Sequence, residues 1–212
     1  VYMDRLFNLG LDKDWAIVGA GVMPSDAKMR EALLPQDYLS TIVEQEKDAS
    51  SARVTGAMVD FVPPGDLPAL IARLADPTIR IVSLTVTEGG YMIDPATGKF
   101  DPDHPAIKKD AANPNAPASV FGIILRGLAL RRERGIAPYT VMSCDNVPHN
   151  GVVTRNAIAG LARLFDAALA DWVVANVAFP NAMVDRITPA TSDRERQLTK
   201  DMFGIEDNWP VF

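Results

Sequence analysis

The chain has 212 residues, a formal net charge of −6, 48% hydrophobic and 23% charged residues, one cysteine and two histidines. This length and composition are those of an ordinary globular domain with a core of its own, and a single cysteine excludes an internal disulfide framework. The acidic balance argues against nucleic-acid binding, and two histidines exclude a multi-histidine metal site. The sequence contains no run of about 18 apolar residues, the length that a membrane span requires, and no secretory signal is visible. We therefore expect a cytoplasmic protein.

The first half of the chain alternates between helical and extended patterns. Residues 2–10 place apolar side chains on one helical face, and residues 15–22 form an apolar run that ends in glycines. Such a run is typical of a strand buried on both faces, as in a parallel sheet. The next expected elements are a helix at 25–35, β-prone stretches at 38–46 and 51–61, a helix at 67–74 and a strand at 79–87.

The second half continues the alternation after one long interruption. Residues 94–118 are rich in proline, aspartate, asparagine and alanine, and they predict an irregular excursion of a kind that is usually functional or mobile. The remaining expected elements are a helix at 119–134, a buried strand at 139–144, a long helix at about 152–174, an extended segment at 177–189 and a solvated segment at 192–200. Strands that alternate with helices predict an α/β fold with a mostly parallel sheet.

Two glycines end the first predicted strand, in the pattern Gly19-x-Gly21. Pro24 stands where a dinucleotide-binding fingerprint would have its third glycine, so a tight turn is the favoured interpretation. A Rossmann fold carries a ribose-binding acid at the end of its second strand, and Asp26 is the nearest candidate. A plain helix cap explains Asp26 equally well.

Polar residues also follow the two other buried strands. Thr87-Glu88-Gly89 forms either a ligand-binding turn or simply a tight turn, because ligands bind at the carboxyl ends of strands in open α/β sheets. The segment from Ser143 to Gly151 contains Asn146, whose amide is suited to hydrogen-bond a carbonyl or alkoxide oxygen during hydride transfer. The alternative is a polar turn, with His149 favoured as an ordinary loop residue over a general base.

The third polar segment lies near the end of the chain and contains Asp185 beside Arg186. These two residues form either a structural salt bridge or a carboxylate offered to a polyhydroxy ligand. The residues that carry a family resemblance in this segment are Val177, Phe179, Ala182, Val184, Asp185, Arg186, Ile187 and Pro189.

With this spacing, the segment resembles the signature of the mannitol dehydrogenase family, the zinc-free long-chain polyol and sugar-acid dehydrogenases. Three further segments agree with the resemblance: residues 14–21, residues 85–91 and residues 143–146. The likeness spans essentially the whole chain. It implies a Rossmann-like α/β domain that binds NAD, with NADP not excluded, and a polyol or sugar acid as the small-molecule partner.

The resemblance also implies roles for individual residues. Asn146 matches an asparagine that forms half of an oxyanion hole at the reacting carbonyl, and it also contacts the substrate. Asp185 matches an aspartate that contacts substrate hydroxyls. Thr87, Glu88 and Gly89 match a cofactor-contacting loop, and Asp26 is the nearby acid for the ribose. The resemblance implies no metal ligand.

Parts of the family pattern have no counterpart in these 212 residues. They are the first strand with its Gly-rich loop, and the catalytic lysine of a C-terminal helical domain. We therefore expect residues 1–212 to be a partial, N-terminal dinucleotide-binding domain with an incomplete sheet, inactive by itself, and with an oligomeric contact at the open sheet edge. The alternative is a stand-alone α/β binding or interaction module without catalytic activity.

Overall fold

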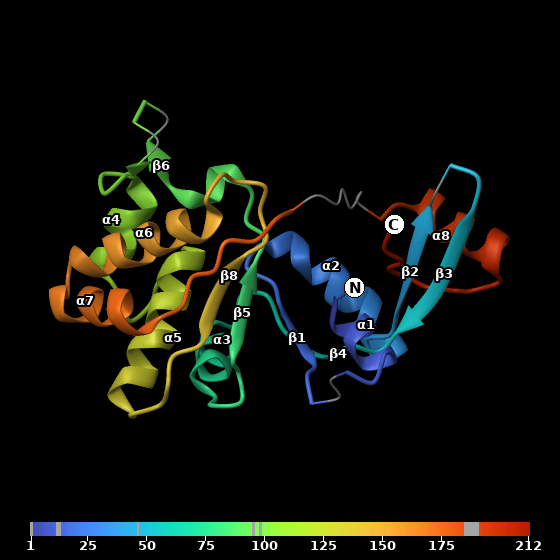
Figure 1. Ribbon diagram of the computed structural model, residues 1–212, viewed down its shortest axis with the longest axis horizontal. Helices are drawn as coiled ribbons and strands as arrows, with labels where there is room; N and C mark the ends of the chain where they lie inside the picture. Colours follow the sequence, from blue (N-terminus) through green and yellow to red (C-terminus); the bar gives the residue numbers. More distant parts are fainter. Residues whose placement is uncertain (1, 12–13, 46, 95, 98, 185–190) are drawn as a thin grey trace. The chain divides into compact units, whose positions relative to one another are not determined.

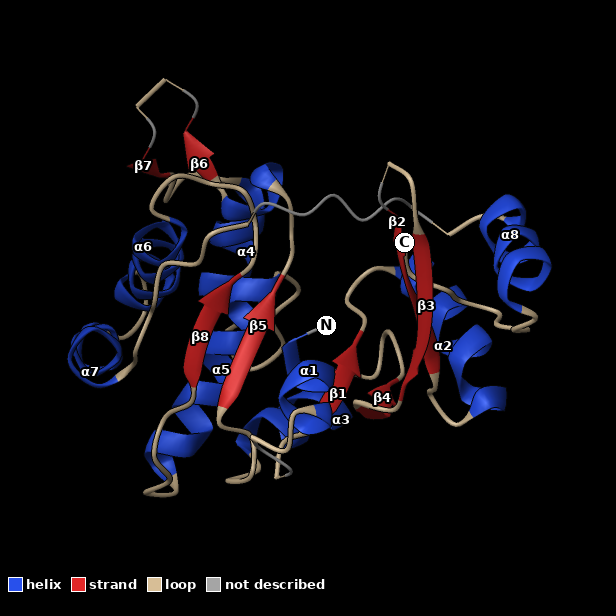
Figure 2. Cartoon of the chain, turned by 45° about the vertical axis from the view of Figure 1, so that its right-hand side comes forward, coloured by secondary structure: helices blue, strands red, loops and turns tan. Residues whose placement is uncertain are grey.

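A computed structural model describes residues 2–11, 14–45, 47–94, 96–97, 99–184 and 191–212 (Figure 1). The chain divides into two compact units. The first unit comprises Val1–Asp66 and Arg186–Phe212, and the second comprises Leu67–Asp185. The strands of the described residues form four two-stranded sheets (Figure 2). Two of the pairs, β1–β4 and β5–β8, are parallel, as the α/β pattern predicts.

The first unit is built on a parallel strand pair and an antiparallel hairpin. Its elements are α1 (Tyr2–Asn8), β1 (Ile17–Ala20), η1 (Pro24–Asp26), α2 (Ala27–Leu33), η2 (Leu34–Gln36), β2 (Ser40–Gln45), β3 (Ser50–Thr55), β4 (Met58–Val62) and α8 (Asp193–Phe203). Gly19 of β1 faces Phe61 of β4, and a Cβ atom at Gly19 would lie 2.4 Å from the Phe61 ring. The first glycine of the Gly-x-Gly pattern therefore makes room for a core side chain.

The end of the chain joins the hairpin of the first unit. Val211 forms a parallel bridge with Ile42, and its amide donates to the carbonyl of Thr41 at 2.8 Å. Asp207, which is buried, accepts hydrogen bonds from the amide of Thr41 and from the Gln36 side chain. These contacts hold residues 207–211 against β2.

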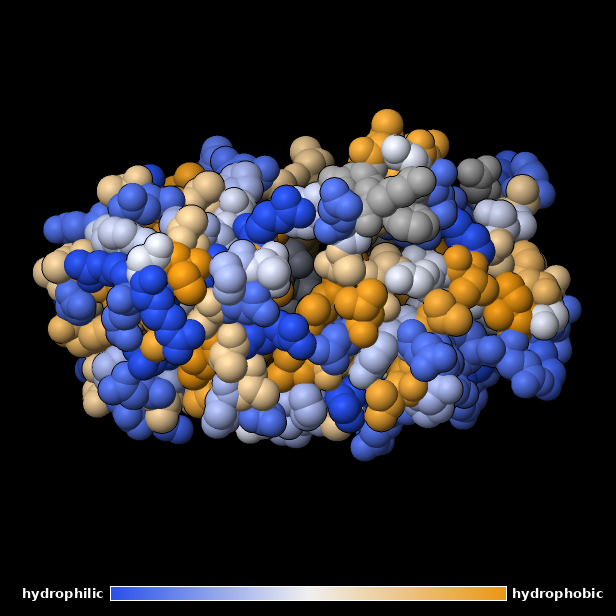
Figure 3. All heavy atoms as spheres, turned by 90° about the horizontal axis from the view of Figure 1, so that it is seen from below, coloured by the Kyte–Doolittle hydropathy of each residue, from blue (hydrophilic) through white to orange (hydrophobic). Residues whose placement is uncertain are grey.

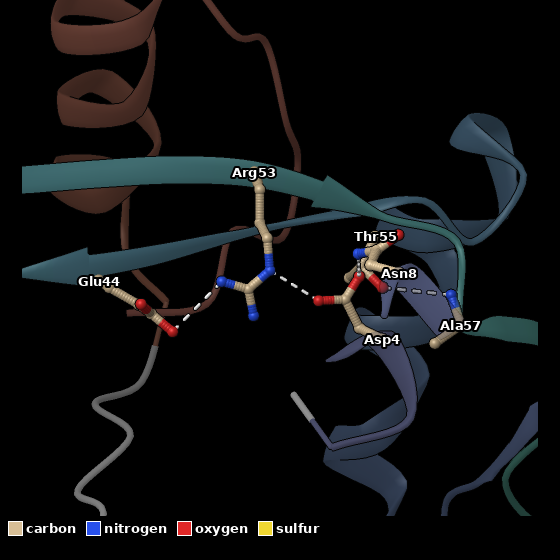
Figure 4. Close-up of polar contacts among 6 residues, drawn as sticks. All are labelled: Asp4, Asn8, Glu44, Arg53, Thr55 and Ala57. Carbon is tan, nitrogen blue, oxygen red and sulfur yellow. Dashed lines mark hydrogen bonds and ion pairs between the residues drawn. The ribbon is translucent and has the colours of Figure 1, made fainter. Parts of the chain in front are cut away.

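A partly buried ion pair, with Asp4 buried and Arg53 half-buried, joins α1 to the same hairpin (Figure 4). Asp4 accepts a 2.6 Å hydrogen bond from Nε of Arg53, whose Nη1 lies 3.2 Å from Glu44. Burial alone would raise the pKa of Asp4, but the hydrogen bonds from Arg53 and Thr55 and the arginine charge together hold it below its usual value. The charged form of Asp4 therefore stabilises the folded unit.

Stability should consequently depend on pH through Asp4. Because the folded-state pKa is lowered, the contribution is present above the unfolded-state pKa of about 3.9 and is lost as the pH falls through the folded-state value. Asp4→Asn should cost about 1–2 kcal/mol at pH 7 and flatten the loss below pH 4, measured by urea unfolding. Asp48→Asn, at an exposed position of the same hairpin, is the control. If the free energy of unfolding of Asp4→Asn fell below pH 4 as steeply as that of the unmodified chain, Asp4 would not be the group responsible for this loss.

The second unit has helices packed around the parallel pair β5–β8 (Figure 1). Its elements are α3 (Leu67–Ala75), β5 (Ile81–Leu84), η3 (Glu88–Tyr91), β6 (Ile93–Asp94), β7 (Lys99–Phe100), α4 (Pro105–Ala112), α5 (Val120–Glu133), β8 (Thr140–Ser143), α6 (Asn150–Arg163) and α7 (Ala167–Asn176). Helix α5 contributes much of the core, with Phe121, Leu125 and Leu128 almost fully buried. It packs against α3 and α6.

Arg131 is 2% exposed and closes one end of this core. Its guanidinium donates to four main-chain carbonyls, those of Leu74, Asp76, Ile79 and Ala137. The guanidinium carbon also lies 4.8 Å from the ring centre of Tyr139. One side chain therefore holds together the end of α3, the entry to β5 and the entry to β8.

Two sequence expectations require correction, and one further element was not expected. The excursion at 94–118 contains a helix, α4, which starts at Pro105 with its first turn capped by the His104 side chain. The expected helix at about 152–174 is two helices, because the Asp166 side chain caps a new start at 2.8 Å from the amide of Leu169. The charged, solvated segment at 192–200, for which no element was expected, folds as the helix α8, which begins with a capping box of Ser192 and Glu195.

The surface carries apolar as well as polar side chains, and Figure 3 shows both kinds on the face it draws. Exposed apolar residues of the first unit include Leu9 and Leu11, at 68% and 70%. Single exposed apolar side chains are normal on globular proteins. Within the described ranges, no helix has the length and apolarity that a bilayer crossing requires.

Candidate functional site

The carboxyl ends of β5 and β8 coincide. Their register pairs Leu84 with Ser143, the last residue of each strand, and the amide of Cys144 donates to the carbonyl of Leu84 at 2.8 Å. Beyond Leu84 and Ser143, each strand is followed by one of the polar segments identified from the sequence. Parallel strands of α/β proteins bind ligands at this edge.

Asp145 connects the two strand ends. Its side chain is 8% exposed, and its two carboxylate oxygens accept hydrogen bonds from the amides of Val86 at 2.9 Å and Thr87 at 3.0 Å. A carboxylate that accepts from main-chain amides forms strong, charge-assisted hydrogen bonds. Asp145 therefore fixes the backbone of the turn that follows β5.

Tyr91 completes this hydrogen-bond network. Its hydroxyl donates to Asp145 at 2.7 Å and also contacts the hydroxyl of Ser143. Burial, with the charge of Asp145 adding to it, raises the pKa of the Tyr91 phenol, which stays neutral and serves as a donor. Tyr91 is fully buried, so the network is closed off from water on this side.

The turn itself has an unusual backbone. Thr87 adopts φ 60° and ψ 165°, a conformation that is costly for a residue with a β-branched side chain, and it precedes η3. A Cβ atom at Gly89 would meet nothing within 4 Å, so the backbone at Gly89 is open to close approach. A strained residue held by a buried carboxylate, followed by an open glycine, fits a turn that contacts a ligand.

The segment after β8 presents three polar side chains. Asn146 is exposed and directly follows the buried Asp145, so its amide is free to contact a ligand. Burial, with the charge of Asp145 adding to it, raises the pKa of the Cys144 thiol, and a protonated thiol is a poor nucleophile. His149 is exposed and has a left-handed backbone at the start of α6.

Asp26 lies in the first unit, after the carboxyl end of β1. One of its carboxylate oxygens accepts from the amides of Val22 and Met23, both at 2.9 Å. A Cβ atom at Gly21 would lie 2.6 Å from Cβ of Asp26 and 2.8 Å from Pro64, so the turn needs glycine there. Asp26 thus organises the turn as a cap, and its second carboxylate oxygen takes no part in these two bonds.

The residues before Asp185 pack against the start of α6. The Asn150 side chain makes two hydrogen bonds to Ala182, and the amide of Gly151 donates to the Asn181 side chain at 2.9 Å. Asp185 itself, proposed from the sequence to contact a substrate, lies outside the described residues.

The structure therefore brings together some of the expected site residues. Thr87, Gly89 and Asn146 lie in one unit, on two segments joined by Asp145, and Glu88 lies in the same turn. Asp26 lies in the other unit. Sequence reasoning missed Asp145, Tyr91 and Asn150; a carboxylate directly after a buried strand was the available signal for Asp145. Among the described residues, no group of three or more potential ligand side chains is arranged to hold a metal ion.

Comparison with known families and proteins gives consistent matches. The family model described as mannitol dehydrogenase Rossmann domain matches residues 2–211. A mannitol 2-dehydrogenase of Cereibacter sphaeroides is 60% identical over 212 residues, which are 100% of this chain and 44% of that protein. A mannitol 2-dehydrogenase of Pyricularia oryzae is 44% identical over 214 residues and also spans the whole chain, which covers 43% of that protein.

Solved structures give the same picture. The Pseudomonas fluorescens mannitol 2-dehydrogenase in ternary complex with NAD and D-mannitol matches 99% of this chain, with a TM-score of 0.94 and 50% identity. A substrate-free D-sorbitol dehydrogenase matches 96% of the chain, with a TM-score of 0.88 and 43% identity. The chain covers 43% of each of these solved chains, so it spans less than half the length of the relatives it matches.

Proposed function

Because the chain belongs to the mannitol dehydrogenase family, we propose that it is the NAD-binding part of an oxidoreductase that transfers hydride between a polyol and its keto form. The observation that carries this proposal is the paired strand end, where Asp145 holds the Thr87 turn and Asn146 follows it. The similarity to a solved relative that contains NAD and D-mannitol supports it.

NAD accepts the hydride when it is bound, and residues of this chain would hold it. The open backbone at Gly89 and the turn Thr87–Glu88–Gly89 fit a nucleotide that approaches the strand end closely. Asp26 is the candidate for the ribose, because a carboxylate there accepts from ribose hydroxyls and repels the extra phosphate of NADP. This favours NAD over NADP.

Asn146 would donate a hydrogen bond to the substrate oxygen that gains negative charge during hydride transfer, and Asp185 would accept from substrate hydroxyls. Both roles rest on the family resemblance. Mannitol and fructose are the favoured pair, because the curated relatives are mannitol 2-dehydrogenases. Mannonate and fructuronate are the second pair to assay.

We further propose that residues 1–212 form a partial dinucleotide-binding domain, with the general base supplied from a helical domain of the longer enzyme. Hydride transfer needs a base to take the alcohol proton, and the lysine that serves in the family has no counterpart in these residues. The isolated chain should therefore not oxidise mannitol, and because the Gly-rich loop of the family pattern also has no counterpart in these residues, NAD binding is measured in the longer enzyme. Turnover by the isolated chain would contradict this proposal.

The cofactor role is tested by Asp145→Asn in the full-length dehydrogenase that contains this chain. An asparagine amide group would turn an N–H toward a main-chain N–H, and the Val86–Thr87 turn would lose one of its anchors. The Kd for NAD should rise about tenfold, which corresponds to about 1.4 kcal/mol. The measurement is isothermal titration with NAD, and thermal unfolding checks that the variant is folded.

Asp103→Asn is the matched control, since Asp103 is an exposed carboxylate of the same unit. Its Kd for NAD should equal that of the unmodified chain. A folded Asp145→Asn variant with unchanged Kd would refute the role of this turn, and a full-length enzyme that fails to bind NAD at millimolar concentration would refute the cofactor assignment.

A further inference from the structure

The side chain of Asn150 uses both ends of its amide inside the protein. It is 2% exposed, and its Nδ2 donates to the carbonyl of Asp145 at 3.0 Å and to the carbonyl of Ala182 at 2.9 Å. Its Oδ1 accepts from the amide of Ala182 at 2.9 Å. A buried side chain so fully bonded has one orientation available to it.

The contact with Ala182 has a second anchor one residue further along α6. The amide of Gly151 donates to Oδ1 of Asn181, and a Cβ atom at Gly151 would lie 2.5 Å from the carbonyl oxygens of Phe179 and Pro180. Segment 179–182 therefore lies directly against the first turn of α6, at a position that only glycine permits. Asn150 is held against this rigid support.

The carbonyl of Asp145 belongs to the peptide group that links Asp145 to Asn146. We propose that Asn150 is a positioning residue for Asn146: it fixes this peptide group against segment 179–182, and so aims the Asn146 amide at the reacting oxygen. The inference rests on the function proposed above. It concerns the main-chain carbonyl of Asp145, whereas the Val86–Thr87 turn is held by the Asp145 carboxylate.

This separation predicts a selective defect. Loss of the Asn150 amide frees the peptide before Asn146, but it leaves both bonds from the Asp145 carboxylate to the cofactor turn in place. Orientation errors of about 1 Å cost about 100-fold in rate, so a partly released Asn146 should cost somewhat less. In the full-length dehydrogenase that contains this chain, Asn150→Ala should lower kcat for mannitol oxidation about 30-fold, with the Kd for NAD changed less than twofold.

A double-mutant cycle distinguishes positioning from a general structural effect. If Asn150 acts through Asn146, Asn150→Ala should lower kcat less than about threefold when Asn146→Ala is already present. Asn181→Ala gives a milder second variant, because Asn181 is exposed and loses only the bond from Gly151. It should lower kcat about threefold, again only when Asn146 is intact. Asn156→Ala, at an exposed position of α6, is the control and should leave kcat unchanged.

The outcomes separate this inference from the proposed function. If the unmodified enzyme oxidises neither mannitol nor mannonate, the proposed function fails. If the enzyme is active and both variants fold, but kcat is unchanged or falls equally with and without Asn146, the positioning role is overturned. If Asn150→Ala does not fold, the Asn181→Ala cycle gives the decision by the same criterion.

Discussion

Replacing Asn146 by alanine should lower kcat for polyol oxidation about 100- to 1,000-fold in the full-length enzyme. The expected size is that of removing one hydrogen-bond donor from an oxyanion-stabilising site. Asn146 is exposed directly after the buried Asp145, so its amide can reach a ligand without rearrangement of the network behind it. Steady-state kinetics with mannitol and NAD measure the effect.

The form of the kinetic defect matters as much as its size. An interaction made mainly in the transition state lowers kcat and kcat/KM by the same factor. Asn146→Asp has nearly the same shape but lacks the amide donor and adds a negative charge beside the developing one, so its kcat should fall at least as far. The Kd for NAD should change less than twofold in both variants. A fall in kcat of less than threefold in Asn146→Ala would exclude Asn146 from the reacting centre.

Arg131→Met should lower the free energy of unfolding of the second unit by about 4 kcal/mol. The methionine keeps much of the apolar stem of the arginine but lacks its N–H donors. The substitution therefore leaves four carbonyls around the buried guanidinium site without this donor, those of Leu74, Asp76, Ile79 and Ala137. Each buried carbonyl left without its donor costs roughly 1–3 kcal/mol, and relaxation of the chain offsets part of the sum. Urea unfolding of the 212-residue chain, followed by circular dichroism, measures the loss.

Arg134→Met is the matched control for this prediction. Arg134 is exposed and lies at the end of the same helix, α5, so its substitution should change the free energy of unfolding by less than about 0.5 kcal/mol. A loss of less than about 1 kcal/mol in Arg131→Met would show that water replaces the guanidinium at these carbonyls.

The sequence identified the elements whose cause is local. The parallel pairs follow from short apolar runs such as Ile81–Leu84, and the helix at 119–134 follows from its apolar spacing. Helix α4 was missed because its stability is not local. Asp110 of α4 is 2% exposed and accepts from the amides of Ala118 and Ser119, which precede α5. Composition cannot reveal a helix held by the next helix along the chain.

The candidate site shows the same division. The residues proposed to contact a ligand, such as Thr87 and Asn146, could be named from polar types at strand ends and from the family resemblance. The position of Asp145 after a buried strand was a signal, but the bonds that give Asp145 and Asn150 their roles could not be predicted, because they include main-chain groups about 30 to 60 residues away in the sequence. Such partners become visible only when the strand register is known.

The Asp145 carboxylate also has a thermodynamic consequence. A free turn must lose backbone conformational entropy when it closes on a ligand, at about 1–2 kcal/mol for each residue that becomes ordered. In this chain Val86 and Thr87 are already ordered by folding, since both amides are bonded to a buried carboxylate. Folding rather than ligand binding therefore bears this entropic cost, and a nucleotide bound at this turn, as proposed, would meet it preorganised.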